Sequence, residues 1–136
     1  MSIFTNWKNK ILVRKRKRRM QRQNEKFPLV RRLYGVKNSQ SALVQSRAGD
    51  DLQIVHAPLP NYPKNVFVYS IPLNLVLGFL DESTSEKLLF SLGANFCVDG
   101  EIESVYQEEP FTCILRIFPT SERMKGVEDF THLYGE

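Results

Sequence analysis

Six consecutive cations occupy residues Arg14–Arg19 of this 136-residue chain. Guanidinium and ammonium groups at this density neutralise phosphates, and the polar residues 21–24 that follow add hydrogen-bond donors. Phe4 and Trp7 precede the run, and aromatic rings stack on unpaired bases without choosing a sequence. These residue types therefore favour contact with a nucleic acid, with RNA or single strands as the preferred form.

Charge is distributed unevenly along the chain. Residues 1–35 carry twelve lysines and arginines against one acid, Glu25, so their net charge is +11. Residues 36–136 carry seven lysines and arginines against fourteen acids, so their net charge is −7. Because a stable fold does not need a self-repelling arm, this asymmetry indicates a polyanionic partner. The candidate phosphate contacts are the cations of the arm, namely Lys8, Lys10, Arg14, Lys15, Arg16, Lys17, Arg18, Arg19, Arg22, Lys26, Arg31 and Arg32.

Other partners fit the same arm. An apolar stripe recurs at three- and four-residue steps, formed by Ile3, Phe4, Trp7 and Ile11. If residues 2–22 form a helix on binding, Phe4 and Trp7 can enter an anionic membrane surface while the cations face the headgroups, as in a matrix-like peripheral protein. The run is also the kind of exposed basic peptide that an import receptor binds, which describes a small nuclear regulator. Mitochondrial import stays open as well, since the first 24 residues lack acids.

Residues suited to catalysis or metal binding are sparse. The chain has two histidines and two cysteines, and no two of the four lie close together in the sequence: His56, His132, Cys97 and Cys113. Zinc sites usually pair ligands within a few residues, and a Cys–His dyad would need a meeting in space that no local motif encodes. Glycine-rich phosphate loops and serine nucleophile elbows are lacking. We therefore expect a non-enzymatic protein without metal or cofactor.

The cysteine count also bears on the compartment. Two cysteines are too few for a disulfide framework, although a single Cys97–Cys113 bridge stays open, and no secretory signal pattern starts the sequence. The longest apolar-rich stretch, residues 71–80, is far shorter than the roughly 20 residues of a membrane-spanning helix. We expect an intracellular protein of the cytoplasm or nucleus, or of a particle if it assembles.

After the arm, the period of the apolar residues changes from that of a helix towards that of a strand. Alternation, or enrichment in β-formers, predicts strands over residues 52–57, 66–71 and 111–118. The segment 73–80 fits a strand or a helix equally well.

Asp99-Gly100 is the strongest local turn signal. Both residues tolerate the positive φ of a two-residue hairpin turn. The pattern therefore predicts a hairpin with flanking strands at 94–98 and 101–107.

One helix has clear start and stop signals. Ser83 and Glu86 have the spacing of a capping box, and Gly93 fits the position just after the last turn. Leu88, Leu89 and Leu92 supply the buried face.

These patterns predict an α+β fold. Residues 36–136 form a compact, acidic, β-rich domain of five or six strands, with at least one hairpin and one or two short helices, and a β-sandwich is the alternative. Residues 1–35 form a basic arm, flexible or helical on binding, with the boundary near Gly35. This layout resembles small virion coat proteins and ribosomal proteins with extensions that enter RNA, although no motif is shared. We expect a structural or accessory protein of a virion or ribonucleoprotein assembly, in which self-association is open.

Overall fold

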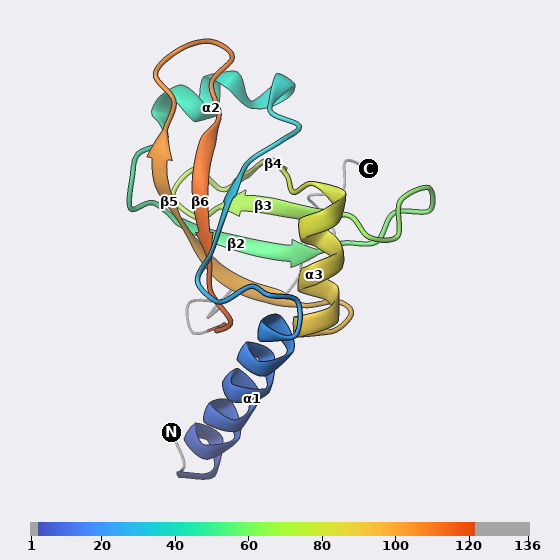
Figure 1. Ribbon diagram of the computed structural model, residues 1–136. Coiled ribbons are helices and arrows are strands. Elements are labelled where there is room, and N and C mark those ends of the chain that lie inside the picture. Colours follow the sequence, from blue (N-terminus) through green and yellow to red (C-terminus); the bar gives the residue numbers. More distant parts are fainter. Residues whose placement is uncertain (1–2, 122–136) are drawn as a thin grey trace.

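The computed structural model describes residues 3–121 and, within them, the side chains from Trp7 onward. The side chain of Phe4 and residue His132 lie outside that range. The described residues form three α-helices, one short 3-10 helix and six strands (Figure 1). In chain order the elements are α1 (Ile3–Gln21), β1 (Leu29–Arg32), η1 (Lys37–Ser39), α2 (Gln40–Gln45), β2 (Asp51–His56), β3 (Val66–Ser70), β4 (Leu75–Phe79), α3 (Glu82–Leu92), β5 (Cys97–Val105) and β6 (Cys113–Ile117).

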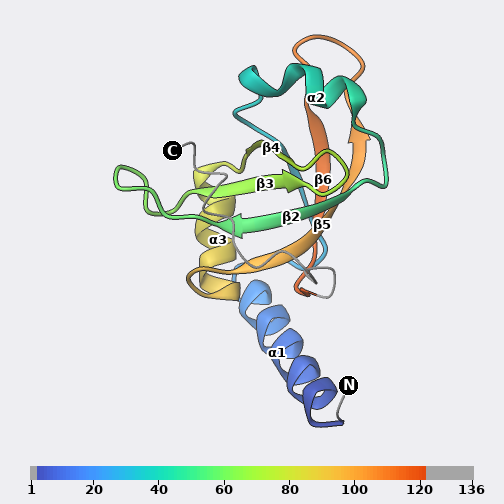
Figure 2. The ribbon, with the colours of Figure 1, turned by 180° about the vertical axis from the view of Figure 1, so that it is seen from behind.

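All six strands of the described chain belong to one antiparallel sheet in the order β1-β6-β5-β2-β3-β4. The sheet is strongly curled, so that β2 and β3 run across the direction of β6 (Figures 1 and 2). Leu29 of β1 pairs with Ile117 of β6, which places the first strand beside the last. One curled sheet with three helices confirms the α+β class and its β-rich character, and it does not fit the alternative of a β-sandwich.

The two edge strands meet at one end of the sheet. Tyr34, just after β1, donates its N–H to the carbonyl of Phe79 at 2.9 Å, and the N–H of Phe79 donates to the carbonyl of Tyr34 at 2.8 Å. This approach requires glycine at position 78, because a Cβ there would overlap the carbonyl oxygen of Tyr34. The bridge draws the curled sheet towards a barrel at this end.

The main core lies inside the curl of the sheet. Leu52 and Ile54 of β2 are fully buried there, and α3 adds Leu88. The largest fully buried apolar side chains are Met20, Leu29, Leu33, Leu43, Leu52, Ile54, Leu77, Leu88, Ile102, Leu115 and Ile117. Burial stabilises the fold by roughly 1.5–3 kcal/mol for each large apolar side chain. Residues before position 35 therefore contribute to the core as the later strands do.

The fold does not separate at the predicted boundary near Gly35. Strand β1 lies within the predicted arm and pairs with β6, and Met20 is fully buried in the core. The part of residues 1–35 that stands outside the core is thus shorter than the predicted arm.

Three predicted strands are confirmed. The predicted strands at 66–71 and 111–118 contain β3 and β6, the one at 52–57 covers all of β2 except Asp51, and the ambiguous segment 73–80 contains β4. In each of these segments, β-branched and aromatic residues fit the half-buried surface of a sheet.

The predicted hairpin at Asp99-Gly100 is wrong. Both residues lie inside the single nine-residue strand β5, where Gly100 pairs with Leu52 of β2 and with Ile117 of β6. A Cβ at position 100 would come within 3.0 Å of the carbonyl oxygen of Arg116. The glycine marks close packing in the middle of the sheet rather than a turn.

The predicted helix is confirmed as α3, but its N-cap is Asp81 rather than Ser83. Oδ2 of Asp81 accepts a hydrogen bond from the N–H of Thr84 at 3.2 Å. Gly93 ends the helix with a φ of 87°, at the predicted position. Aspartate and serine are equally good N-caps. The helix therefore begins two residues earlier in the chain than predicted.

Candidate nucleic-acid interface

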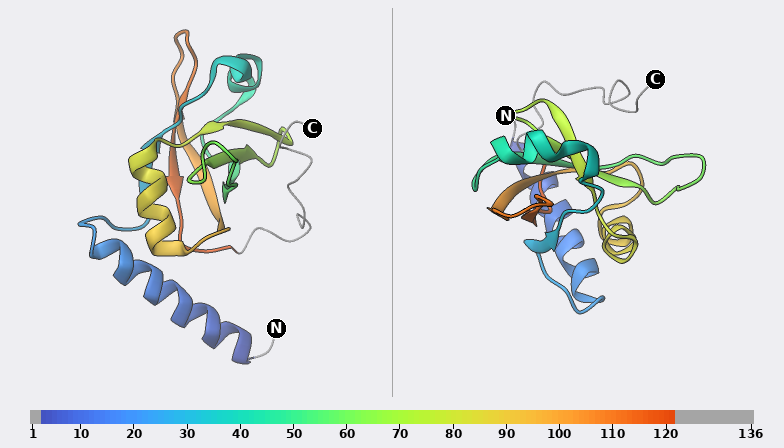
Figure 3. Two further views of the ribbon diagram at one scale, coloured as in Figure 1. Left: turned by 90° about the vertical axis from the view of Figure 1, so that its right-hand side faces the viewer. Right: turned by 90° about the horizontal axis from the view of Figure 1, so that it is seen from above.

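Helix α1 projects from the sheet and is held along one side (Figures 1 and 3). Met20 is fully buried, and the hydroxyl of Ser91 in α3 lies 3.8 Å from its sulfur. Nη1 of Arg16 donates to the carbonyl of Pro119 at 2.7 Å, and Nε2 of Gln23 donates to the carbonyl of Lys87 at 3.1 Å. These contacts fix the second half of the helix on the domain.

Glu25, the one acid among residues 1–35, is bonded to the domain. Its Oε1 lies 2.7 Å from Nη2 of Arg31 and 2.9 Å from Nζ of Lys87. The hydrogen bond from Lys87, together with the charge of Arg31, holds the pKa of Glu25 below its ordinary value although partial burial opposes this. Glu25 thus joins the end of α1 to β1 and α3. Its charge pairs with Arg31 and Lys87 and does not neutralise the basic run.

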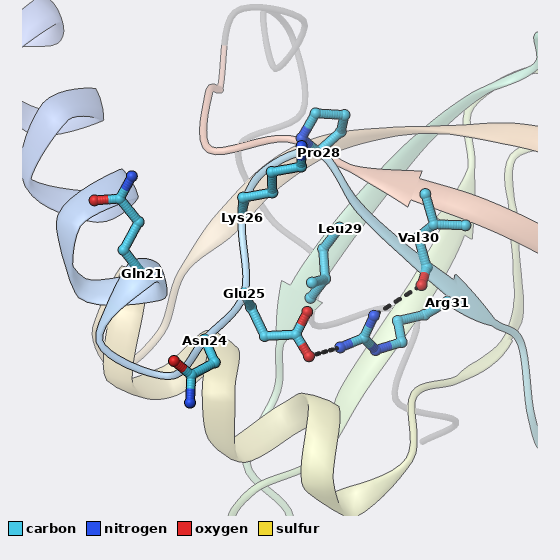
Figure 4. Close-up of a pocket in the computed structure, with 8 residues that line it drawn as sticks. All are labelled: Gln21, Asn24, Glu25, Lys26, Pro28, Leu29, Val30 and Arg31. Atoms are coloured by element: carbon cyan, nitrogen blue, oxygen red, sulfur yellow. Dashed lines mark hydrogen bonds and ion pairs between the residues drawn. The ribbon is translucent and has the colours of Figure 1, made fainter.

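A pocket of about 610 Å³ opens beside Glu25, between the end of α1 and β1 (Figure 4). In it the carboxylate of Glu25 and the guanidinium of Arg31 point toward each other, and Arg31 also donates to the carbonyl of Val30 at 2.9 Å. Because this acid and this base are bonded to each other, neither is free for proton transfer. Lys26, which lines this pocket, is a further exposed cation beside the end of α1.

Most of the predicted phosphate contacts are exposed. Nine of the twelve have exposed side chains on α1 or just after it, namely Lys8, Lys10, Arg14, Lys15, Lys17, Arg18, Arg19, Arg22 and Lys26. Helix α1 contains no acid, and none of the nine forms an ion pair with another residue of the described chain. Uncompensated cations at helical spacing repel one another, and bound phosphates would remove that repulsion.

Two predicted contacts serve the fold instead. Arg16 is half-buried through its bond to Pro119, and burial, followed by the charge of Arg19, lowers its pKa. Arg31 is engaged by Glu25 and also donates from Nε to Oγ1 of Thr84 at 3.1 Å. These two guanidinium groups are not available to a partner in the way that their neighbours are.

Arg32, the remaining predicted contact, lies on β1 rather than on α1. Its guanidinium is 5.9 Å from the ring centre of Tyr34 and 5.5 Å from that of Tyr106. Both tyrosines are exposed and neither was a candidate in the sequence. No local sequence pattern links Tyr106 with Arg32 and Tyr34. The pairing of β1 with β6 and of β6 with β5 brings Tyr106 to the same surface.

The side of α1 that packs on the domain is not the predicted apolar stripe. Residues advance by roughly 100° around an α-helix, which places Val13, Arg16 and Met20 on one side and Trp7 and Ile11 on the opposite side. Val13 is partly buried and Met20 fully buried, whereas the Trp7 side chain is 60% exposed. Trp7 therefore faces away from the fold and remains accessible for stacking or for a membrane surface.

Cys97, Cys113 and His56, the described residues considered for thiol catalysis or zinc binding, are buried or hydrogen-bonded within the fold. Burial raises the pKa of both Cys97 and Cys113 to about 12, so both thiols stay protonated near neutral pH, and neither is in a disulfide. Nε2 of His56 lies 2.7 Å from the carbonyl of Pro63, and its Nδ1 accepts the N–H of Asn95 at 2.8 Å. Residues 7–121 also hold no group of three or more His, Cys, Asp or Glu that could bind a metal ion.

Comparisons with protein-family models, with curated proteins and with solved structures gave no match. None of the helices in the described part of the chain has both the length and the apolar character needed to cross a bilayer. The candidate interface is therefore assessed from its own geometry.

Proposed function

We propose that this protein is a non-enzymatic structural or accessory protein that binds nucleic acid through the exposed cations of α1. The supporting observation is a set of seven exposed, unpaired cations on a helix without acids, with two more, Arg22 and Lys26, just after it. The domain holds this helix in place through Met20, Arg16 and Gln23. A helix that is already positioned loses less conformational entropy on binding than a flexible arm would.

The distribution of apolar residues favours nucleic acid over a membrane surface. A helix that lies in a membrane interface needs an apolar side along its length. On α1 the exposed apolar residues, Trp7 and Leu12, lie in the first half, and residues 14–22 have none because Met20 is buried in the fold. The second half of α1 thus offers phosphates a purely cationic surface.

A matched pair of double variants tests the proposal. Lys15→Gln with Arg19→Gln removes two charges from α1, and Lys37→Gln with Arg47→Gln removes the same two residue types from exposed positions elsewhere. Affinity for a labelled single-stranded oligonucleotide is measured against salt concentration. The α1 variant should have a log–log slope shallower by about 1.4, since each neutralised phosphate contributes roughly 0.7.

The control variant should keep the parent slope. Equal losses in the two variants would show that net charge alone drives binding, which contradicts an interface on α1. Loss of binding to anionic vesicles with an unchanged slope on the oligonucleotide would favour the membrane alternative. No change on either probe would leave the basic run as an import signal.

A further inference from the structure

The arrangement of side chains around α1 narrows the kind of nucleic acid, and this inference rests on the proposed function. Successive residues of an α-helix are rotated by roughly 100°, so α1 has four distinct sides. The packed side holds Val13, Arg16 and Met20. The ridge opposite to it holds Trp7, Ile11, Arg14 and Arg18. Between them, one flank carries Lys8, Lys15 and Arg19, and the other flank carries Lys10 and Lys17.

Exposure in the fold agrees with this division. All five cations of the two flanks are exposed, and so are Arg14 and Arg18 on the ridge. On the packed side, Met20 is fully buried and Arg16 is bonded to Pro119. The domain therefore lies on the packed side of the helix, and the other three sides of α1 are open to solvent (Figure 3).

Two rows of cations on opposite flanks fit a groove with phosphates on both walls. An α-helix with its side chains is about 10–12 Å across, and the major groove of B-form DNA is about 12 Å wide. The major groove of A-form RNA is too deep and narrow for side chains to read. A single strand has only one backbone, which would leave one flank without phosphates.

We propose that α1 binds in the major groove of duplex DNA. The flank of Lys8, Lys15 and Arg19 contacts one phosphate backbone, and the flank of Lys10 and Lys17 contacts the other. The ridge then faces the base edges, where guanidinium groups bind guanine and apolar side chains contact the thymine methyl. The sequence favours RNA or single strands because Phe4 and Trp7 can stack on unpaired bases. The cations on both flanks of a positioned helix change that preference.

The first test compares three labelled probes: a 20-base-pair DNA duplex, an RNA duplex of the same sequence and one DNA strand alone. The full-length protein should bind the DNA duplex at least about tenfold more tightly than the RNA duplex, because only the B-form groove admits the helix. Equal affinity for the three probes would overturn the groove proposal while leaving nucleic-acid binding by α1 intact. Absence of binding to every probe would overturn the proposed function as well.

The second test separates ridge from flank. Arg14→Gln with Arg18→Gln removes two ridge charges, and Lys8→Gln with Lys15→Gln removes two flank charges. Dimethyl sulfate methylates guanine N7 in the major groove, and a guanidinium group bonded to N7 blocks this reaction. The parent and the flank variant, at concentrations that saturate the duplex, should protect N7, and the ridge variant should lose protection. A parent that binds the DNA duplex without protecting N7, or two variants with the same protection pattern, would overturn the proposal.

Discussion

Arg16 differs from the other cations of the basic run because its side chain is used inside the protein. Its guanidinium bonds to the carbonyl of Pro119, and its charge is partly removed from water. Arg18, two positions later, is exposed on the other side of the helix. One residue type thus has a structural role at position 16 and an exposed side chain at position 18, where we propose that it contacts a partner.

Arg16→Met should therefore destabilise the protein by about 1–2 kcal/mol, since a hydrogen bond from a charged donor is lost and a buried carbonyl is left unpaired. Arg18→Met is the matched control and should leave stability within about 0.5 kcal/mol of the parent. Denaturant unfolding of both variants measures the difference. Equal stability of the two variants would contradict the structural role of Arg16.

At the scale of elements, Glu25 couples the end of α1 to β1 and α3. The carboxylate form is favoured by Lys87 and Arg31, so the pKa of Glu25 in the folded protein lies below its ordinary value of 4.5. The carboxylate therefore contributes stability above about pH 4.5, and this contribution is lost as the pH falls through the lower folded pKa.

Glu25→Gln should accordingly be less stable than the parent at pH 7, and the difference should be smaller at an acidic pH below the folded pKa of Glu25, where the parent carboxylate is protonated too. Chemical denaturation of both proteins at the two pH values checks this expectation. A difference of the same size at both pH values would mean that the carboxylate charge is not what stabilises this junction.

The start of α3 gives a second prediction at this scale. Asp81 caps the helix through the N–H of Thr84, whereas Ser83 lies exposed in the first turn. Asp81→Ala should cost about 1 kcal/mol of stability, and Ser83→Ala should have little effect. Thermal melts of the two alanine variants distinguish the caps, and a larger loss for Ser83→Ala would show that the sequence-based cap is the functional one.

Local patterns predicted the elements whose signal is contained within them. Strands β2, β3 and β6 have β-formers along their own length, and α3 has its own cap and terminal glycine. Strand β1 escaped prediction because Arg31 and Arg32 give it the composition of an arm, although Leu29 and Leu33 are buried. Gly100 was misread because its need for glycine comes from neighbouring strands that lie elsewhere in the sequence.

The candidate interface was predicted in part for the same reason. The composition of the N-terminal segment was enough to single out the cations of α1 as candidates. The structure adds that most of their side chains are exposed. The bond of Arg16 to Pro119, the ion pair of Glu25 with Lys87 and the contact of Arg32 with Tyr106 depend on residues that only the fold brings together.

For the whole molecule, the attachment of α1 has a direct consequence for truncation. Deletion of residues 1–12 removes no core side chain that the structure describes and should leave a cooperative unfolding transition close to that of the parent. Deletion of residues 1–26 also removes Met20, whose loss from a core typically costs 2–5 kcal/mol, together with Glu25. Calorimetry of the two truncated proteins should show a large loss of stability only for the longer deletion, and similar melts for both would place α1 outside the cooperative unit.

The pairing of the first strand with the last also orders events during synthesis. Arg16 and Pro119 are 103 positions apart, and Thr112 reaches back 79 positions to the carbonyl of Leu33. Contacts between such distant positions make folding slow, because the chain must close large loops before it gains their energy. The sheet is completed only after residue 117 has been synthesised. Until then Arg16 lacks its contact with Pro119. The cations of residues 14–19 are therefore accessible on the ribosome before the fold positions them.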